Sequence, residues 1–502
     1  MALLTQESEW EETRLMNCNN IYDIPKEKFT FVQNETKIKE VPLTAKHSSY
    51  TKDALTRFAK NKGSVICFFI ILLLALYAIF VPIFSPYKIY SRDGYFAYAS
   101  PKSPLFSHLG FWNGTKKQEV NEVTYDYLSL IPDAIYKDLG EKTRFIAARP
   151  QTWHVIKVNT YALTGWVKML LSKEEYEEAL AWEKETGTQL FYPLLNESLI
   201  KNVSYKGDQN AWALTDAKGN LEYTKDKKIQ DIFLRDSDNN PVYTIQRMMG
   251  SQVETRVLYK EWYKYKNGRY ASFLFGADKS GYDIFTRLAY GARLSLVLSI
   301  FVASVNLFLG IIIGAIEGYY GGTVDLIIER IKDILYDVPT LVIFALFQLY
   351  LSNKTGPLAS MFFAFIFYGW IGPSSTVRAQ FYRFKGQDYV NASRTLGASD
   401  ARLIFKHILP NSIGFIITAS VLTIPGVIFS EANLTYLGIV NLEGDTMTSV
   451  GTMLNAAKDT LATNPHCLFF PAAFISILLI CFNEFGNGLR DAFNPTLRGA
   501  EE

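Results

Sequence analysis

DYVNASRTLGASDARLIFKHILPN, residues 388–411, lies between two apolar segments and carries Arg394, Arg402 and Lys406. Short loops rich in lysine and arginine favour the cytoplasmic side of a membrane. The first part of the loop has small residues that tolerate a helix, and Gly397 then interrupts it. This pattern predicts a cytoplasmic loop of a membrane protein, folded as two short helices that meet at Gly397.

The second of these helices is expected to begin at Ser399, a residue type that caps helices well, and to end at Pro410. Between these two residues the apolar positions recur at helical spacing. The residues at this spacing are Leu403, Ile404 and Ile408, together with His407. Because such a loop has no core of its own, we expect its apolar side to dock against a separate soluble subunit. An ordinary amphipathic loop helix would show the same spacing.

Composition excludes several other classes of protein. Lys and Arg number 51 and Asp and Glu 49 among the 502 residues, so the net charge of +2 gives no argument for nucleic-acid binding. The four cysteines are scattered without CxxC spacing, and the five histidines form no HExxH or paired-ligand pattern. We therefore expect no catalytic residue, no metal site and no cofactor in this chain.

Six apolar segments are candidates to cross a bilayer. The first, residues 64–84, is uncharged and would span roughly 30 Å at about 1.5 Å per residue. The other five cover residues 294–316, 338–351, 358–371, 413–431 and 467–482. The length of the polar stretch before the first segment makes a cleaved signal peptide unexpected. The predicted fold class is an α-helical polytopic membrane protein with six transmembrane helices and both termini in the cytoplasm.

Charged residues and prolines mark special places in these segments. Glu329 and Lys332 alternate with apolar residues ahead of the third span, and such charges need a protein or aqueous neighbour. We expect them to line the interior of the bundle or its cytoplasmic surface. Pro339 predicts a bend after these charges, and Pro425 predicts a break within the fifth span. The centres of the spans carry almost no charge, which weighs against a proton-coupled carrier.

These features divide the chain into four parts. Residues 1–63 form a cytoplasmic tail and residues 64–86 the first transmembrane helix. Residues 87–275 form an extracytoplasmic α+β domain inserted between helices 1 and 2. Residues 276–502 form the membrane core, which contains helices 2–6 and the cytoplasmic loop 378–411. The inserted domain has no cysteine and must be held together by its own core.

Local patterns predict three elements of the inserted domain. Residues 153–158 alternate like a β-strand. Ser172 and Glu175 have capping-box spacing at the start of a helix that Gly187 would end. The Asn-Gly pair at residues 267–268 lies between two aromatic-rich runs and predicts a β-hairpin.

The loop resembles the coupling signature of permease subunits of ABC importers in the oligopeptide, dipeptide and nickel family. That signature is Glu-Ala-Ala, three residues, Gly, nine residues and Ile-x-Leu-Pro. The matching positions are Asn391, Ala392, Ser393, Gly397, His407, Leu409 and Pro410. The residues at 391, 393 and 407 differ in type from the signature. On this resemblance, the candidate residues for coupling to an ATPase are these seven together with Ala398, Asp400 and Leu403.

Two further motifs resemble the same family at the opposite ends of the spans. GADKSGYDIFTRLAYGAR, before the second span, is similar to the family's Gly-Thr-Asp-x-x-Gly-Arg-Asp-x-x-Ser-Arg-Leu-x-x-Gly-Ala-Arg. Its matching residues are Gly276, Asp278, Gly281, Asp283, Arg287, Gly291, Ala292 and Arg293. EANLTYLGI resembles Glu-x-x-Leu-Ser-Phe-Leu-Gly and contributes Glu431, Leu437 and Gly438. We expect the charged members of the first motif to lie at the membrane interface.

The resemblance implies a six-helix ABC importer permease in the plasma or inner membrane. Its implied partners are a second permease, two ATPase subunits, an extracytoplasmic solute-binding protein and membrane lipid. Peptides are the solutes it favours. The chain contains no GxxxxGK[ST] phosphate loop, so ATP and Mg²⁺ are expected to bind in the partner ATPases.

A second hypothesis is a membrane-anchored binding or sensor protein in which the inserted domain does the work. The family has only a short connection at the position of this domain, so the resemblance implies nothing about its role. Its aromatic residues could form a docking platform or lid, but most of them are expected to fill its own core.

Overall fold

The computed structural model describes residues 50–129, 131–146, 149–192, 200–202, 212–214, 220, 247–444 and 446–493. The expected tail, apart from its last residues, lies outside these ranges. The chain divides into two compact units, Met1–Thr56 and Arg57–Glu502. Helix α2, Tyr50–Lys60, crosses this division, and every contact described below lies within the second unit.

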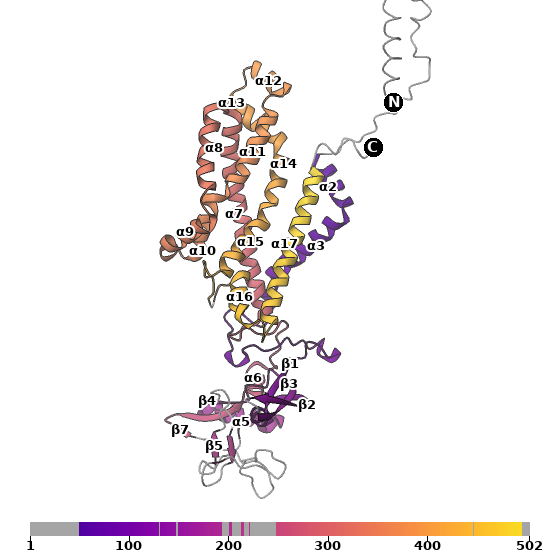
Figure 1. Cartoon of the computed structure of the whole chain (residues 1–502), viewed down its shortest axis with the longest axis vertical. Helices are drawn as coiled ribbons and strands as arrows, with labels where there is room; N and C mark the ends of the chain where they lie inside the picture. Colours follow the sequence, from indigo (N-terminus) through magenta and orange to yellow (C-terminus); the bar gives the residue numbers. More distant parts are fainter. Residues whose placement is uncertain are drawn as a thin grey trace, which may run out of the picture. The chain divides into compact units, whose positions relative to one another are not determined.

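Long apolar helices form the membrane part of the second unit (Figure 1). Within the described residues, five helical runs are long and apolar enough to cross a membrane. They are Lys62–Phe84 (α3), Ile284–Tyr320 (α7), Pro357–Phe384 (α10 and α11), Asp400–Tyr436 (α13 to α15) and His466–Phe493 (α17). A sixth span results if α8, Gly322–Tyr336, and α9, Thr340–Thr355, are counted together. These two helices are bent by 78°, and Pro339 precedes α9, so the predicted bend is confirmed.

The fifth span begins earlier than predicted, because Pro410 does not end the preceding helix. A π-helical turn, Leu403–Ile408, continues directly into α14, Leu409–Val421. Proline normally clashes with the turn before it, and the wider π turn relieves that clash. Asn411 donates a hydrogen bond from Nδ2 to the His407 carbonyl at 2.7 Å, which satisfies one acceptor of the distorted turn. The break expected near Pro425 falls at Leu422, between α14 and α15, Thr423–Tyr436.

Helices α7 and α11, Ile371–Phe384, pack with their backbones very close together. Gly310, Gly314 and Gly318 recur every fourth residue of α7 and face α11. A Cβ on Gly314 would lie 2.3 Å from the Ser374 carbonyl oxygen, and one on Gly318 would lie 2.5 Å from the Phe381 Cβ. Small residues at this spacing let membrane helices approach closely and gain dispersion energy.

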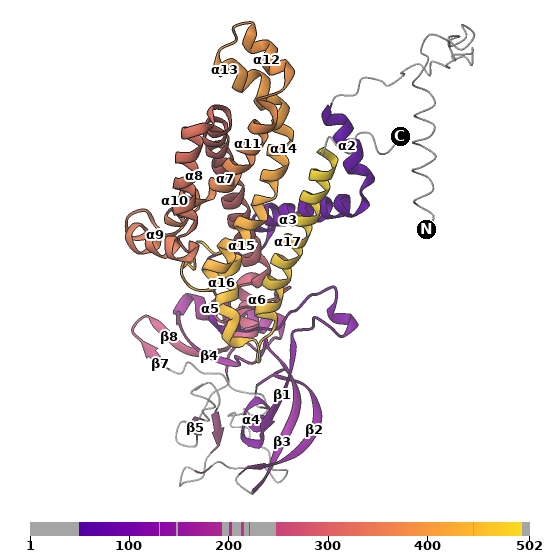
Figure 2. The ribbon, with the colours of Figure 1, turned by 45° about the horizontal axis from the view of Figure 1, so that its top comes forward.

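Between α3 and α7 the chain forms an α+β region with small antiparallel sheets (Figure 2). One sheet has the order β1-β3-β2, with strands Thr115–Asn121, Arg149–Asn159 and Ile135–Ile146. A second has the order β4-β8-β7, with strands Trp166–Ser172, Gln252–Leu258 and Arg247–Met249. Short strands β5, Ile200–Asn202, and β6, Trp212–Leu214, pair with each other. The helices are α4, Glu122–Ser129, α5, Lys173–Thr186, and α6, Tyr259–Asn267.

Two of the three elements predicted here are confirmed. Residues 153–158 lie in β3. Helix α5 begins where expected, since the Ser172 hydroxyl accepts a hydrogen bond from the Glu175 N–H at 3.1 Å, and it ends at Gly187 with φ +64°. The burial of Trp166 and Trp262 agrees with the expectation that aromatic residues fill this core.

The hairpin predicted at residues 267–268 is wrong. Asn267 is the last residue of α6, and Gly268, with φ +67°, ends that helix. Tyr259 and Trp262, three residues apart, are both buried in the domain core, so the run of aromatics follows a helical period. An Asn-Gly pair supplies a left-handed residue after a helix as readily as it supplies a hairpin turn.

Candidate functional site: an exposed loop above a buried ion cluster

The loop at residues 388–411 folds into two short helices, as predicted. They are α12, Asp388–Thr395, and α13, Asp400–Arg402. Gly397 lies between them with φ +81°, and a Cβ there would meet nothing within 4 Å. Its backbone conformation, rather than close packing, therefore requires glycine. Ser399 occupies the cap position of α13, although its side chain makes no capping hydrogen bond. Figures 1 and 2 show both helices at the end of the helical bundle.

The apolar face of this loop is covered by the chain itself, which corrects the expectation that it lacks a core. Leu403, Ile404 and Ile408 are buried in a cluster that includes Val377 and Phe381 of α11. The uninterrupted path from α13 into α14 holds these side chains against α11. Leu403 therefore supports the shape of the loop and offers no surface to a partner.

A different set of side chains remains exposed on the loop. Leu396 is 88% exposed and Phe405 is 64% exposed, and neither residue belongs to the coupling signature. Among the candidate coupling residues, Asn391, Ala392, Asp400 and Pro410 are exposed. Ser393, Ala398, His407 and Leu409 are half-buried. Two large apolar side chains left exposed on a short loop mark a surface suited to a protein partner.

The loop is tied to the end of α7. The Tyr319 hydroxyl donates a hydrogen bond to Asp400 Oδ1 at 2.6 Å, and Lys385 Nζ, at the end of α11 just before the loop, donates to the Gly318 carbonyl at 2.9 Å. Helix α7 contains 37 residues and is about 55 Å long at the usual helical rise. Movement of the loop is thereby linked to a helix that reaches the region where the α+β part begins.

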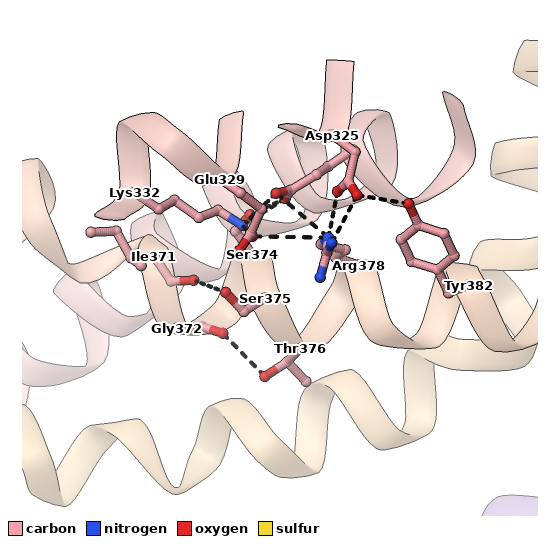
Figure 3. Close-up of polar contacts among 11 residues, drawn as sticks. Asp325, Glu329, Lys332, Ile371, Gly372, Ser374, Ser375, Thr376, Arg378 and Tyr382 are labelled. Atoms are coloured by element: carbon pink, nitrogen blue, oxygen red, sulfur yellow. Dashed lines mark hydrogen bonds and ion pairs between the residues drawn. The ribbon is translucent and has the colours of Figure 1, made fainter. Parts of the chain in front are cut away.

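A cluster of charged side chains joins α7, α8 and α11 (Figure 3). Glu317 of α7 is fully buried, and Lys332 of α8 donates to both of its carboxylate oxygens at 2.9 and 2.6 Å. Lys332 also contacts Glu329 at 2.9 Å. Ser374 of α11 donates to Glu317 at 3.2 Å. The sequence predicted that Glu329 and Lys332 need a neighbour in the interior or at the cytoplasmic surface; the structure confirms the neighbour, with Lys332 buried and Glu329 half-buried.

The other half of the cluster is centred on Arg378. Its guanidinium group binds both carboxylate oxygens of Asp325 at 2.5 and 2.8 Å, and Tyr382 donates to the same carboxylate at 2.8 Å. Arg378 also lies 3.7 Å from Glu317, which connects the two halves. Buried ions are costly unless they are paired and hydrogen-bonded. This network therefore fixes the mutual positions of three helices.

The motif at the start of α7 forms a tight turn against the α+β region. Gly276 and Gly281 both have φ +82°, and a Cβ on Gly281 would lie 1.7 Å from the Asp93 carbonyl oxygen. Asp278 accepts hydrogen bonds from the Ser280 and Tyr282 N–H groups. Asp283 caps α7 by accepting from the Thr286 N–H at 3.0 Å. Gly276, Gly281, Asp278 and Asp283 thus form the turn and the cap that begin α7.

The remaining motif residues are spread over several environments. Gly291 lies against the start of α16, Val450–Ala457, and Arg293 is exposed beside Tyr290. Arg287 is buried, with Asp278 at 3.8 Å and Glu443 at 3.9 Å.

The motif residues at the end of α15 lie in different environments. Glu431 is buried and accepts from Ser295 at 2.7 Å, Leu437 is exposed, and Gly438 ends the helix with φ +77°. In the described residues, no three His, Cys, Asp or Glu side chains come together to hold a metal ion.

Apolar helices with a bent pair and an exposed loop define a multi-pass helical membrane protein. Residues 306–499 match the family of binding-protein-dependent transport system inner membrane components. Residues 49–101 match the N-terminal transmembrane domain of oligopeptide transport permease C.

Two relatives are permease proteins of oligopeptide and dipeptide transport systems. The oligopeptide permease protein OppC of Bacillus subtilis is 43% identical over 224 residues, 45% of this chain and 72% of the relative. The dipeptide permease protein DppC of the same organism is 40% identical over 229 residues, 45% of this chain and 70% of the relative. A solved methionine ABC transporter chain, MetNI, is 14% identical, with a TM-score of 0.35 over 41% of this chain and 96% of that chain. This chain belongs to the oligopeptide and dipeptide permease family of ABC importers.

Proposed function

We propose that this chain is a permease subunit of an ABC importer for oligopeptides or dipeptides. It forms the translocation pathway with a second permease, and a pair of ATPase subunits binds ATP and Mg²⁺. A solute-binding protein delivers the cargo on the extracytoplasmic side. Support comes from the relatives named above, which are permease proteins of oligopeptide and dipeptide transport systems. The hypothesis of an anchored sensor is not favoured, because the transport-system family matches residues 306–499 of the membrane core.

The exposed loop carries the proposal for ATPase coupling. Leu396 and Phe405 project from a loop whose buried side is fixed to α11 and whose Asp400 is bonded to the end of α7. Closure of the ATPase pair would move such loops and switch the pathway between its two accessible states. In this proposal the loop faces the cytoplasm, both termini are cytoplasmic, and residues 87–275 are extracytoplasmic.

Replacing Leu396 with glutamate is expected to abolish co-purification of the ATPase subunits and reduce uptake at least tenfold, because a charge enters an apolar contact. Pull-down of the complex and transport into proteoliposomes measure both effects. Leu461→Glu is a matched control, since Leu461 is also an exposed leucine but lies beyond α16, far from the loop in sequence. Parental ATPase assembly in Leu396→Glu would contradict the assignment of the docking surface.

The α+β domain at residues 87–275 is proposed to receive the solute-binding protein. Replacing it with a short flexible linker is expected to lower delivery by the binding protein several-fold while ATPase assembly persists, because the loop lies at the other end of α7. Uptake measured with and without the binding protein, beside pull-down of the ATPase, tests this division of labour. Unchanged uptake after the replacement would show that the domain has another task.

A further inference from the structure

A cavity of about 760 Å³ lies between the end of α3 and the α+β region. Its apolar wall consists of Phe80, Val81 and Phe84 of α3, Phe285 of α7, and Tyr270 and Leu274. Phe84 is 76% exposed at the end of a candidate membrane span. The apolar wall is therefore continuous with the surface that α3 presents to lipid.

Two cations line the same cavity, Lys102 and Arg269. They come from segments that are joined by hydrogen bonds, since the Lys102 N–H donates to the Phe273 carbonyl at 2.8 Å and Ser272 Oγ donates to the Lys102 carbonyl at 3.1 Å. The domain thus holds both side chains in one place.

Each of these cations rests on an aromatic ring instead of a carboxylate. The Lys102 ammonium lies 4.7 Å from the centre of the Tyr161 ring, and the Arg269 guanidinium lies 5.0 Å from that of Tyr87. In the part of the chain that the structure describes, neither forms an ion pair with an acidic residue. Burial, and then the charge of nearby Lys260, lower the pKa of Lys102. A bound anion would offset both effects.

We propose that this cavity is a binding site for an anionic phospholipid from the leaflet on the side of the α+β domain. The acyl chains lie along the wall made by α3, and the headgroup phosphate accepts hydrogen bonds from Lys102 and Arg269. Asp283 also lines the cavity, where its Oδ2 caps α7, and we place the phosphate against the two cations. A soluble anion would use the cations but would leave the apolar wall uncovered. An apolar wall for the acyl chains beside two cations for the phosphate favours a lipid over a soluble anion.

The site is tested by native mass spectrometry of the full-length chain, delipidated in detergent and titrated with phosphatidylglycerol or phosphatidylcholine. We expect the parent to retain phosphatidylglycerol in preference to phosphatidylcholine. Lys102→Gln/Arg269→Gln should weaken this retention by about tenfold or more, as expected for losing hydrogen bonds to a charged group. Leu274→Trp, which fills the slot and keeps both cations, should weaken it as well. Circular dichroism reports whether each variant is folded.

Lys117→Gln/Lys137→Gln is the matched control, because it removes the same charge from exposed positions on β1 and β2. This control should retain lipid like the parent. Parental retention in the folded Lys102→Gln/Arg269→Gln variant would overturn the proposal, and so would an equal loss in the control. Displacement of the lipid by an equal concentration of glycerol 3-phosphate would show that the headgroup alone is the ligand, which also overturns it.

Discussion

Replacing Gly314 with alanine is expected to destabilise the helical bundle by about 1–3 kcal/mol, the range measured for overpacked cores. The new methyl group would lie 2.3 Å from the Ser374 carbonyl oxygen and 2.8 Å from the Val377 Cβ. Both atoms belong to the framework of α11 and cannot rotate away. The helices must separate, and the neighbouring contacts at Gly310 and Gly318 weaken with them. Thermal unfolding of the detergent-solubilised chain, followed by circular dichroism, measures the loss.

Gly372→Ala is the control for this experiment. Gly372 lies in α11, and a Cβ there would meet nothing within 4 Å. Alanine is favoured over glycine in a helix by about 1 kcal/mol, so this variant should be as stable as the parent or slightly more stable. The packing argument fails if the two variants unfold at the same temperature. Because α7 and α11 also carry residues of the ion cluster and contact the loop, separating them should disturb both.

Local sequence was enough to predict that the loop splits into two helices at Gly397. Glycine adopts the left-handed conformation found there, φ +81°, without help from its neighbours. The burial of Leu403 could not be predicted in this way. It depends on Val377 and Phe381, which belong to a helix that precedes the loop. An amphipathic pattern shows that a face must be covered but does not show what covers it.

The same distinction holds elsewhere in the chain. Charge within an apolar segment predicted that Lys332 needs a partner, yet Glu317 and Arg378 lie on other helices and only the fold brings them together. The Asn-Gly pair at residues 267–268 specifies a left-handed residue, and the preceding helix α6 decides that this residue is a cap. Sequence patterns thus predicted local backbone conformations and which side chains require a partner. The identity of each partner depends on tertiary packing.

Replacing Lys332 with methionine is expected to destabilise the bundle by about 3–5 kcal/mol, because it leaves the fully buried Glu317 carboxylate without its closest cation. Arg378 is 3.7 Å from Glu317 and already binds Asp325, so it compensates only in part. Adding Glu317→Gln removes the uncompensated charge and should recover most of the lost stability. Thermal unfolding of the single and double variants measures both steps.

Arg330→Met separates this effect from a general loss of charge on α8. Arg330 pairs with Asp333 at 2.9 Å, but its side chain is 72% exposed, and exposed pairs contribute only about 0–1 kcal/mol. This variant should therefore unfold close to the parent. Equal unfolding temperatures for Lys332→Met and Arg330→Met would mean that the buried cluster adds no stability. Failure of Glu317→Gln to rescue Lys332→Met would mean that Lys332 acts through packing instead of charge. If both expectations hold, the cluster is what keeps α7, α8 and α11 in register beneath the loop. A partner that pulls on the loop would then move the three helices together.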